Sequence, residues 1–419
     1  GVLNIAVMEG KIEKITLDGV QDSAINMAFP DSKDRVLNLR DIEQGLEQLN
    51  RLASRQLTVD IHPGTRSEYS RVELIPVDSR FPASLDIGFD NRGQKSTGTW
   101  QMSASLTIDN VLRLADRWSL NAGHDSEFRH DRRSRSLSGG VTIPYGYWLF
   151  GAQYDWSDSF QTLGMTDPAV KWRYQGMVQS QRLTLGRTLY RDGLQRLAMD
   201  TSFTRKKTEN RLADVRLDVS SPDLTVFTAG FNYSRSVAGG YLTFGPMLAK
   251  GLHITGATAD RPGYSSLPVS EFRRYSMSAS WYYPLAPSVY WLTSAYGQTS
   301  PDNLYSSERV SVGGQYSVRG FKEQYLSGNR GGYLRNELNW RMGDIPHAGT
   351  LSLTGAVDTG QVSTQKNQVD GGSLTGAALG IELEGRWFSH SLTLGVPLYW
   401  PDSLHPDKQV VYWQATVSL

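Results

Sequence analysis

From Leu85 to the C-terminus the sequence alternates apolar and polar residues, the pattern of β-strands. Over residues 100–109, large apolar residues form one face, and Gln, Ser, Thr and Asp form the other. The same alternation recurs over 227–234 and 411–419. A soluble β-sandwich also alternates, but long strands with one face of Ser, Thr, Gly and Asn suit a water-filled interior surrounded by lipid. The pattern therefore predicts a membrane β-barrel, with a soluble all-β fold as the alternative.

The composition excludes several classes of protein. No run approaches the roughly 18 apolar residues of a transmembrane helix, so a helical membrane protein is excluded. The 20 Tyr and 11 Trp suit the two membrane interfaces. The net charge of +1 gives no field that would favour nucleic acid. The chain has no cysteine, so neither a disulfide nor a Cys-ligated metal can hold the fold.

Bacterial single-chain barrels have an even number of strands, with short periplasmic turns and longer outer loops. The weakest strand pattern, Arg211 to Ser220, follows a charged run and is assigned to an outer loop. Sixteen strands are then predicted, near 85–91, 98–109, 117–127, 134–143, 147–157, 173–190, 194–207, 224–236, 240–250, 271–284, 288–299, 331–343, 348–358, 374–384, 387–397 and 410–419. Short turns are expected at 144–146, 191–193, 238–239 and 284–287, and long outer loops at 158–172, 251–270, 300–330 and 359–373.

Residues 1–77 follow a different pattern. Val2 to Leu17 reads as a strand with a bulge at residues 8–10, and Ser23 to Phe29 as a short helix. An amphipathic helix is predicted from Leu39 to Leu52, with its apolar face formed by Leu39, Ile42, Leu46, Leu49 and Ala53. Asn38 is the expected N-cap, with Asp41 in the first turn. Two strands, 57–61 and 69–76, complete a β-α-α-β-β order.

No signal peptide is visible, because Gly1 opens directly into a strand pattern. An outer-membrane protein needs such a signal, so we expect the segment before Gly1 to have been removed.

The stretch from 310 to 330 is long, polar and rich in glycine, and it lies between two predicted strands. Near its middle is a single cation, Arg319, between Val318 and Gly320 and followed by Phe321.

Strand parity gives a carboxylate that could meet this cation. In the strand from Leu351 to Asp358, the leucine face must point to lipid, so Asp358 points into the barrel.

These segments together resemble the TpsB family of two-partner secretion transporters, of the FhaC and CdiB type. The order β-α-α-β-β, the string LNRLAS (49–54) and the string HPG (62–64) are similar to the second POTRA domain of that family. Family members carry a plug helix and a first POTRA before it, and both are missing from this sequence. The string VRGF resembles the tip of the family's inward-folded loop, and GAVDTG, from Gly355 to Gly360, resembles its inward aspartate motif. Within the family, the CdiB type is our expectation.

The resemblance implies a pairing of Arg319 with Asp358, which we call the loop–barrel lock. A guanidinium matches a carboxylate bidentately. In a wet lumen the pair need not be strongly stabilising, and its expected role is to hold the loop in one of two states. The preceding strand, Gly332 to Arg341, places Arg335, Glu337 and Arg341 on the lumen face. There they line a protein-conducting path or pack against the loop and plug. Asn336 interrupts the apolar face of this strand.

The expected fold is therefore mainly β: a POTRA domain over 1–77 and a 16-stranded transmembrane barrel over 78–419, with the loop 300–330 folded inside. The resemblance implies export of an unfolded, large β-helical exoprotein of the TpsA type (an adhesin, a cytolysin or a CdiA-like toxin). The POTRA would recognise it in the periplasm by strand addition.

The sequence carries no recognisable enzyme or metal motif. The seven histidines are scattered, and neither an HExxH site nor a GxSxG elbow occurs, so no enzyme, cofactor or metal is expected. A monomer surrounded by outer-membrane lipid is expected, with no nucleic-acid partner. The alternatives are a BamA-like insertase and a passive porin.

Overall fold

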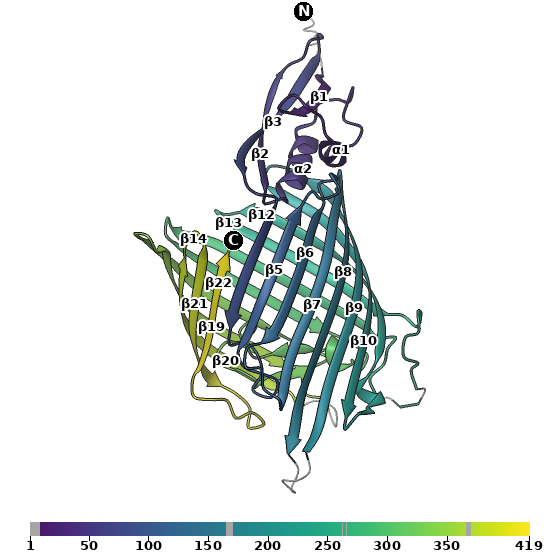
Figure 1. Ribbon diagram of the computed structural model, residues 1–419, viewed down its shortest axis with the longest axis vertical. Coiled ribbons are helices and arrows are strands. Elements are labelled where there is room, and N and C mark those ends of the chain that lie inside the picture. Colours follow the sequence, from purple (N-terminus) through teal and green to yellow (C-terminus); the bar gives the residue numbers. More distant parts are fainter. Residues whose placement is uncertain (1–8, 165–170, 262, 265, 366–369) are drawn as a thin grey trace, which may run out of the picture.

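A small α/β domain stands at one end of a large closed β-barrel (Figure 1). The computed structural model describes residues 9–164, 171–261, 263–264, 266–365 and 370–419. Of the strand predicted from Val2 to Leu17, residues 2–8, which include the first residue of the predicted bulge, lie outside this range, and the described strand begins at Lys11. In the part of the chain that is described, no helix is long and apolar enough to cross a membrane.

The N-terminal domain has the predicted β-α-α-β-β order. Its elements are β1 (Lys11–Leu17), α1 (Ser23–Ala28), α2 (Leu39–Asn50), β2 (Arg55–Pro63) and β3 (Tyr69–Ser79). The sheet order is β1-β3-β2, with β1 parallel and β2 antiparallel to β3. Main-chain hydrogen bonds join the outer side of β1 to residues 34–37, so among residues 9–79 the exposed edge of this sheet is β2.

Helix α2 begins as predicted, because the Asn38 side chain accepts a hydrogen bond from the Arg40 N–H at 2.9 Å. Ile42 and Leu49 are buried in the domain core. The predicted apolar face is wrong at its two ends, since Leu39 is 53% exposed and Ala53 is also exposed.

Two glutamines of α2 are buried where the helix meets the barrel. Gln48 Nε2 donates to the carbonyl oxygens of Gly146 and Trp148, at 3.0 and 3.2 Å. Gln44 donates to the same Gly146 carbonyl at 3.5 Å. Further contacts between this domain and the turns of the barrel are Arg51 Nη2–Ala115 O at 3.3 Å, Ser54 N–Asp109 Oδ2 at 3.0 Å, Tyr147 Oη–Asp41 Oδ1 at 2.5 Å and Arg191 Nη1–Glu47 Oε2 at 2.7 Å. Polar groups of the helix and of the residues that follow it thus fix the domain on the periplasmic turns.

The barrel closes with 16 antiparallel strands, as predicted. They are β4 (Ala83–Asp90), β5 (Gln101–Asp109), β6 (Arg117–Asp125), β7 (Arg132–Tyr145), β8 (Trp148–Gly164), β9 (Lys171–Arg191), β10 (Gln195–Leu212), β12 (Asp223–Val237), β13 (Gly240–Gly251), β14 (Arg273–Ala286), β15 (Val289–Thr299), β18 (Gly331–Ile345), β19 (Gly349–Val362), β20 (Gly372–Glu384), β21 (Phe388–Tyr399) and β22 (Val410–Ser418). The ring closes where β22 pairs with β4.

Three outer loops differ from the prediction. The predicted loop 359–373 is shorter at both ends, because β19 runs to Val362 and β20 begins at Gly372. Most of 158–172 is not loop, because β8 continues to Gly164 and β9 begins at Lys171. The segment 211–220 crosses no membrane, as predicted, but β10 runs to Leu212 and pairs with the two-residue strand β11 (Val215–Arg216), before the short helix η1 (Asp218–Ser220). Cross-strand hydrogen bonding extends these hairpins beyond the point where the apolar alternation ends.

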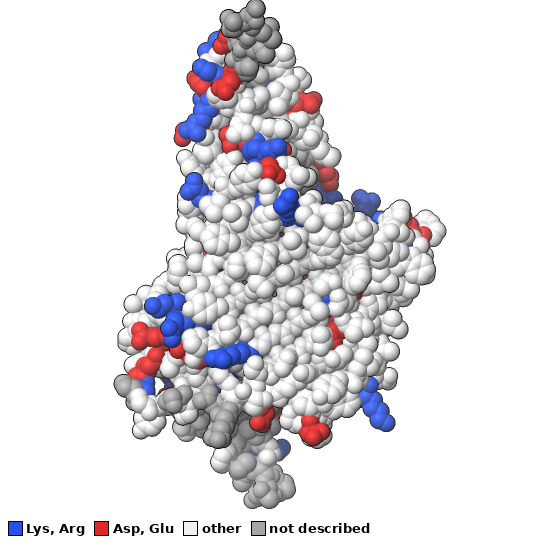
Figure 2. Space-filling view, turned by 180° about the vertical axis from the view of Figure 1, so that it is seen from behind, with Lys and Arg blue, Asp and Glu red and all other residues white. Residues whose placement is uncertain are grey.

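The outer surface follows the predicted parity. On the face shown in Figure 2, a white band crosses the barrel below the small domain, and most charged residues lie toward the two ends of the molecule. Val357 is 54% exposed on this surface, whereas its neighbour Asp358 is fully buried inside. The polar Asn336, which interrupts the outer face of β18, accepts a hydrogen bond from Thr293 of β15 at 2.8 Å. Its side chain is therefore satisfied within the wall.

Candidate functional site

The loop between β15 and β18 folds into the barrel. It contains the short helix η2 (Ser306–Glu308) and a small hairpin of β16 (Val310–Val312) and β17 (Leu326–Gly328). Apolar residues of this hairpin pack against Val362 of β19 and Leu374 of β20. The loop is thus attached to the inner wall through a core of its own.

Arg319 lies in the tip of this loop and meets Asp358 of β19. Its Nε donates to Asp358 Oδ2 at 2.6 Å and its Nη2 to Oδ1 at 2.7 Å. The main-chain N–H of Arg319 adds a third bond, to Oδ2 at 3.0 Å. The two side chains are only 7% and 0% exposed. The expectation that the pair lies in a wet lumen is therefore wrong, because the loop and the wall bury both side chains.

Two of the predicted lumen charges join this pair. Glu337 of β18 contacts Arg319 Nη1 at 2.9 Å and Arg335 Nη2 at the same distance. Arg335 also donates to the carbonyl of Tyr316 in the loop, at 3.1 Å. Arg341 does not take part: it is largely exposed near the periplasmic end of β18 and pairs with Asp344 at 3.2 Å. Two arginines and two carboxylates thus form one neutral network between loop and wall.

Apolar neighbours seat the loop tip on either side of Arg319. Val318 and Phe321 are fully buried, together with Val310, Val312 and Leu326. The Phe321 carbonyl accepts a hydrogen bond at 2.8 Å from the hydroxyl of Tyr412, which is buried on β22. The predicted motif residues on both sides of the cation therefore hold the tip.

Glycine is required where the loop backbone approaches the wall. Gly320 has a φ of +105°, and a Cβ there would lie 2.5 Å from the Val396 carbonyl oxygen. A Cβ on Gly376 would lie 1.7 Å from the Arg319 carbonyl oxygen, and one on Gly395 would lie 2.7 Å from the Gly320 nitrogen. Gly376 and Gly395 were not predicted, because a glycine in a strand gives no signal that a distant loop presses against it.

The two glycines predicted from the strand motif differ in role. A Cβ on Gly360 would lie 2.4 Å from Val312 Cγ1, so this glycine makes room for the loop hairpin. Gly355 faces the other side of the wall, where its nearest neighbour would be Leu379, 4.0 Å away. Gly355 therefore makes no contact with the loop.

The far side of the tip is bound to the outer loops beside β4 and β22. Lys322 Nζ donates to the Asn91 carbonyl at 2.5 Å, and Tyr316 Oη accepts from Arg92 at 2.5 Å. The Gln324 side chain accepts from the His405 N–H at 3.1 Å. The tip thus lies along the inner wall from β18 and β19, across β20 and β21, to the extracellular ends of β22 and β4.

Within residues 9–164, 171–261, 263–264, 266–365 and 370–419, no three His, Cys, Asp or Glu side chains lie together as a metal site.

Comparisons with known proteins agree with this architecture. The family described as haemolysin secretion/activation protein ShlB/FhaC/HecB matches residues 68–383, and the POTRA domain family matches residues 11–63. The outer membrane transporter CdiB of Escherichia coli is 42% identical over the whole of this chain, which spans 71% of that relative. The haemolysin transporter ShlB of Serratia marcescens is 31% identical over 91% of the chain and 68% of the relative.

Solved structures give the same result. The structure of CdiB from Escherichia coli superposes with a TM-score of 0.94 at 41% identity, covering 98% of this chain and 77% of that one. BamA from Haemophilus ducreyi superposes with a TM-score of 0.57 at 13% identity, over 98% of this chain and 85% of that one. The second likeness concerns the fold alone.

Proposed function

Because the chain belongs to the ShlB/FhaC/HecB family of secretion/activation proteins, we propose that it exports one large TpsA-type exoprotein through its barrel lumen. It is a two-partner secretion transporter of the outer membrane, with its POTRA domain in the periplasm. The observation that carries the proposal is the loop in the lumen, held to the wall by one buried guanidinium–carboxylate pair. A barrel of this strand number is wide enough for an aqueous channel, so a displaced loop leaves a path for an unfolded chain.

In this proposal, the domain of residues 1–77 recognises the cargo, and the barrel of residues 78–419 conducts it across the membrane. The exposed edge of β2 supports strand addition as the mode of recognition, because its outer main-chain groups are available to an extended peptide. The cargo would be an adhesin, a cytolysin or a toxin of the CdiA type. The transporter acts as a monomer in outer-membrane lipid and catalyses no reaction.

Deleting residues 11–76 tests the division of labour. We expect export to be lost while the barrel still assembles, because the barrel strands pair through main-chain bonds that this domain does not make. Cargo is measured in the medium at equal transporter level in the outer membrane. Export at the level of the intact chain would remove the POTRA domain from the mechanism.

A further inference from the structure

The outer face of the barrel carries a cluster of arginines at the extracellular ends of β7, β8 and β9. Strand parity places Arg133, Arg135 and Arg173 on this face, since their strand neighbours such as Ser134 point inward. Aromatic rings lie under all three guanidinium groups. The Cζ atoms of Arg133 and Arg173 lie 5.0 and 3.9 Å from the ring centroid of Phe160. That of Arg135 lies 5.0 Å from the ring of Trp156.

One carboxylate balances only part of this charge. Asp158 accepts from Arg133 and Arg135, each at 3.0 Å, and from Gln175 at 2.8 Å. Its side chain is 2% exposed, whereas the arginines are 30% and 42% exposed. Three cations against one anion leave an excess of two positive charges pointing outward. The Arg133 Nε is buried and has no hydrogen-bond partner among the described residues.

The level of the cluster matches a membrane surface. Trp148 lies at the periplasmic end of β8, and Asp158 follows ten residues later. Ten residues span roughly 33 Å along a strand, or about 25 Å along the barrel axis at a tilt of about 40°. The apolar band of an outer-membrane barrel is about 25 Å tall. The arginines therefore lie at the head-group level of the outer leaflet.

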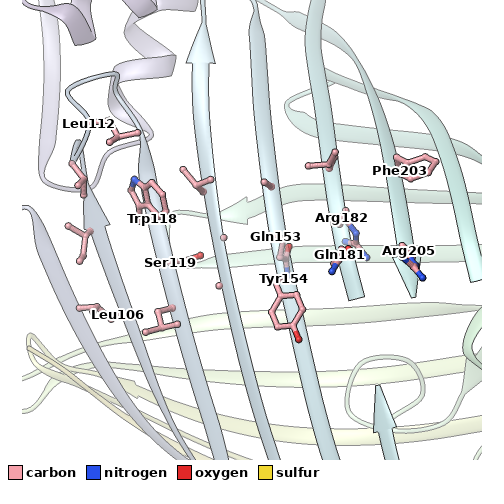
Figure 3. Close-up of a pocket in the computed structure, with 18 of the residues that line it drawn as sticks. Leu106, Leu112, Trp118, Ser119, Gln153, Tyr154, Gln181, Arg182, Phe203 and Arg205 are labelled. Carbon is pink, nitrogen blue, oxygen red and sulfur yellow. The ribbon is translucent and has the colours of Figure 1, made fainter. Parts of the chain in front are cut away.

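An apolar groove of about 1080 Å³ lies on the periplasmic side of this cluster, and Tyr154, two residues before Trp156, is one of its lining residues. Figure 3 shows its lining residues on neighbouring strands, from Leu106 and Trp118 to Phe203. Gly139 and Ala152 form a low floor between the larger side chains of Leu120, Tyr154 and Leu183. Arg205 closes the groove on the side of β10. The groove lies at the depth of acyl chains, below a cationic surface at the depth of head groups.

We propose that this face binds the phosphorylated glycolipid of the outer leaflet, with its phosphates on Arg133, Arg135 and Arg173 and an acyl chain in the groove. Guanidinium groups bind phosphate bidentately and through charge-assisted hydrogen bonds. Rings beneath them hold their planes in place and reduce the conformational freedom lost on binding. This site lies outside the lumen and is independent of the export path.

Native mass spectrometry of the full chain, extracted in detergent, tests the site with bisphosphorylated lipid A as the probe. Each arginine near an anionic surface accounts for about a fivefold change in affinity, so Arg133→Gln/Arg135→Gln/Arg173→Gln should weaken binding about a hundredfold. Arg173→Gln alone should weaken it about fivefold. That single variant leaves both ion pairs of Asp158 intact, so it reports on binding even if the triple variant fails to fold.

Arg187→Gln is the matched control, because Arg187 lies on the same strand as Arg173 and stacks on Trp148, 4.7 Å away, at the periplasmic end. It should leave lipid A binding unchanged. Dephosphorylated lipid A should bind weakly to every variant. Equal loss in Arg187→Gln, or equally tight binding of phosphatidylglycerol, would overturn the proposal in favour of general attraction between a cationic protein and anionic lipid.

Discussion

Arg319→Ala should release the lumen loop more than any other single arginine change. The substitution removes a fork that binds Asp358 at 2.6 and 2.7 Å and Glu337 at 2.9 Å, all in a site from which water is excluded. Removing one partner of a buried pair costs about 3–5 kcal/mol, because the other charge stays buried and unpaired. The main-chain N–H of Arg319 still binds Asp358 in the variant, so we expect the lower part of this range.

Asp358→Ala should have a smaller effect. Arg319 then keeps its contact with Glu337, so the remaining charge still has a partner. In the double variant, the loss should be less than the sum of the two single losses, as for residues that act as one unit.

The absence of cysteine from the chain provides a direct assay. Ser317 lies two residues before the arginine and is 6% exposed, so Ser317→Cys introduces one protected thiol in the loop tip. The rate of maleimide labelling then reports how often the loop leaves the wall. A cost of about 3 kcal/mol corresponds to labelling roughly a hundredfold faster in Arg319→Ala.

Arg341→Ala serves as the control. Arg341 lies on the same inner face of β18 but pairs with Asp344, away from the loop, so labelling should stay at the original rate. The same variants should secrete less cargo at equal transporter level. Unchanged labelling in Arg319→Ala, or single effects that simply multiply in the double variant, would refute the role of the pair.

Three further changes follow from the contacts described. Gly376→Ala should displace the loop tip and so raise the conductance of the barrel in planar bilayers, because the new Cβ would lie 1.7 Å from the Arg319 carbonyl oxygen. Gly355→Ala is the control: its Cβ meets nothing closer than 4.0 Å, so this variant should conduct like the original chain. Gln48→Ala should loosen the POTRA domain by about 1–3 kcal/mol, since the Trp148 carbonyl loses its donor and the Gly146 carbonyl keeps only the longer bond from Gln44. Distances between spin labels on the two domains should broaden. Acidification should weaken the junction between the POTRA domain and the barrel turns. Burial raises the pKa of Asp116, but the hydrogen bonds that its carboxylate accepts from the N–H groups of Leu112 and Leu114 and from Trp118 outweigh this effect. They hold the pKa of Asp116 below 3.8. The stabilisation is complete above pH 3.8 and is lost as the pH falls further, and Asp116→Asn should remove this dependence in the spin-label distances.

The barrel could be predicted from the sequence because strand parity is a local property. Each residue's face follows from its neighbours two positions away, which placed Asp358 inside and Val357 outside without any tertiary information. The contact of Arg319 with Asp358 required more than parity, and it rested on the resemblance of two motifs.

Features that depend on contacts between distant segments were missed. Gly376 and Gly395 matter only because the loop tip presses on them, and nothing in their own strands indicates this. Gln44 and Gln48 are polar residues on an amphipathic helix, and they are buried because the barrel turns supply their partners. The loop–barrel lock is buried because of how the loop packs on the wall. Composition and strand alternation do not determine this packing.

The POTRA domain is attached to one side of the periplasmic rim of the barrel. Among the described residues, its hydrogen bonds and ion pairs reach β5–β10 and the turns between them, and none reaches the turns that join β12 to β13, β14 to β15, β18 to β19 or β20 to β21. One half of the rim is therefore fastened, and the opposite half carries no such brace. If the cargo is bound to the POTRA domain, a force that pulls it outward through the lumen would tilt the domain about this one-sided attachment. The force would then act mainly on the turns of β5 to β10.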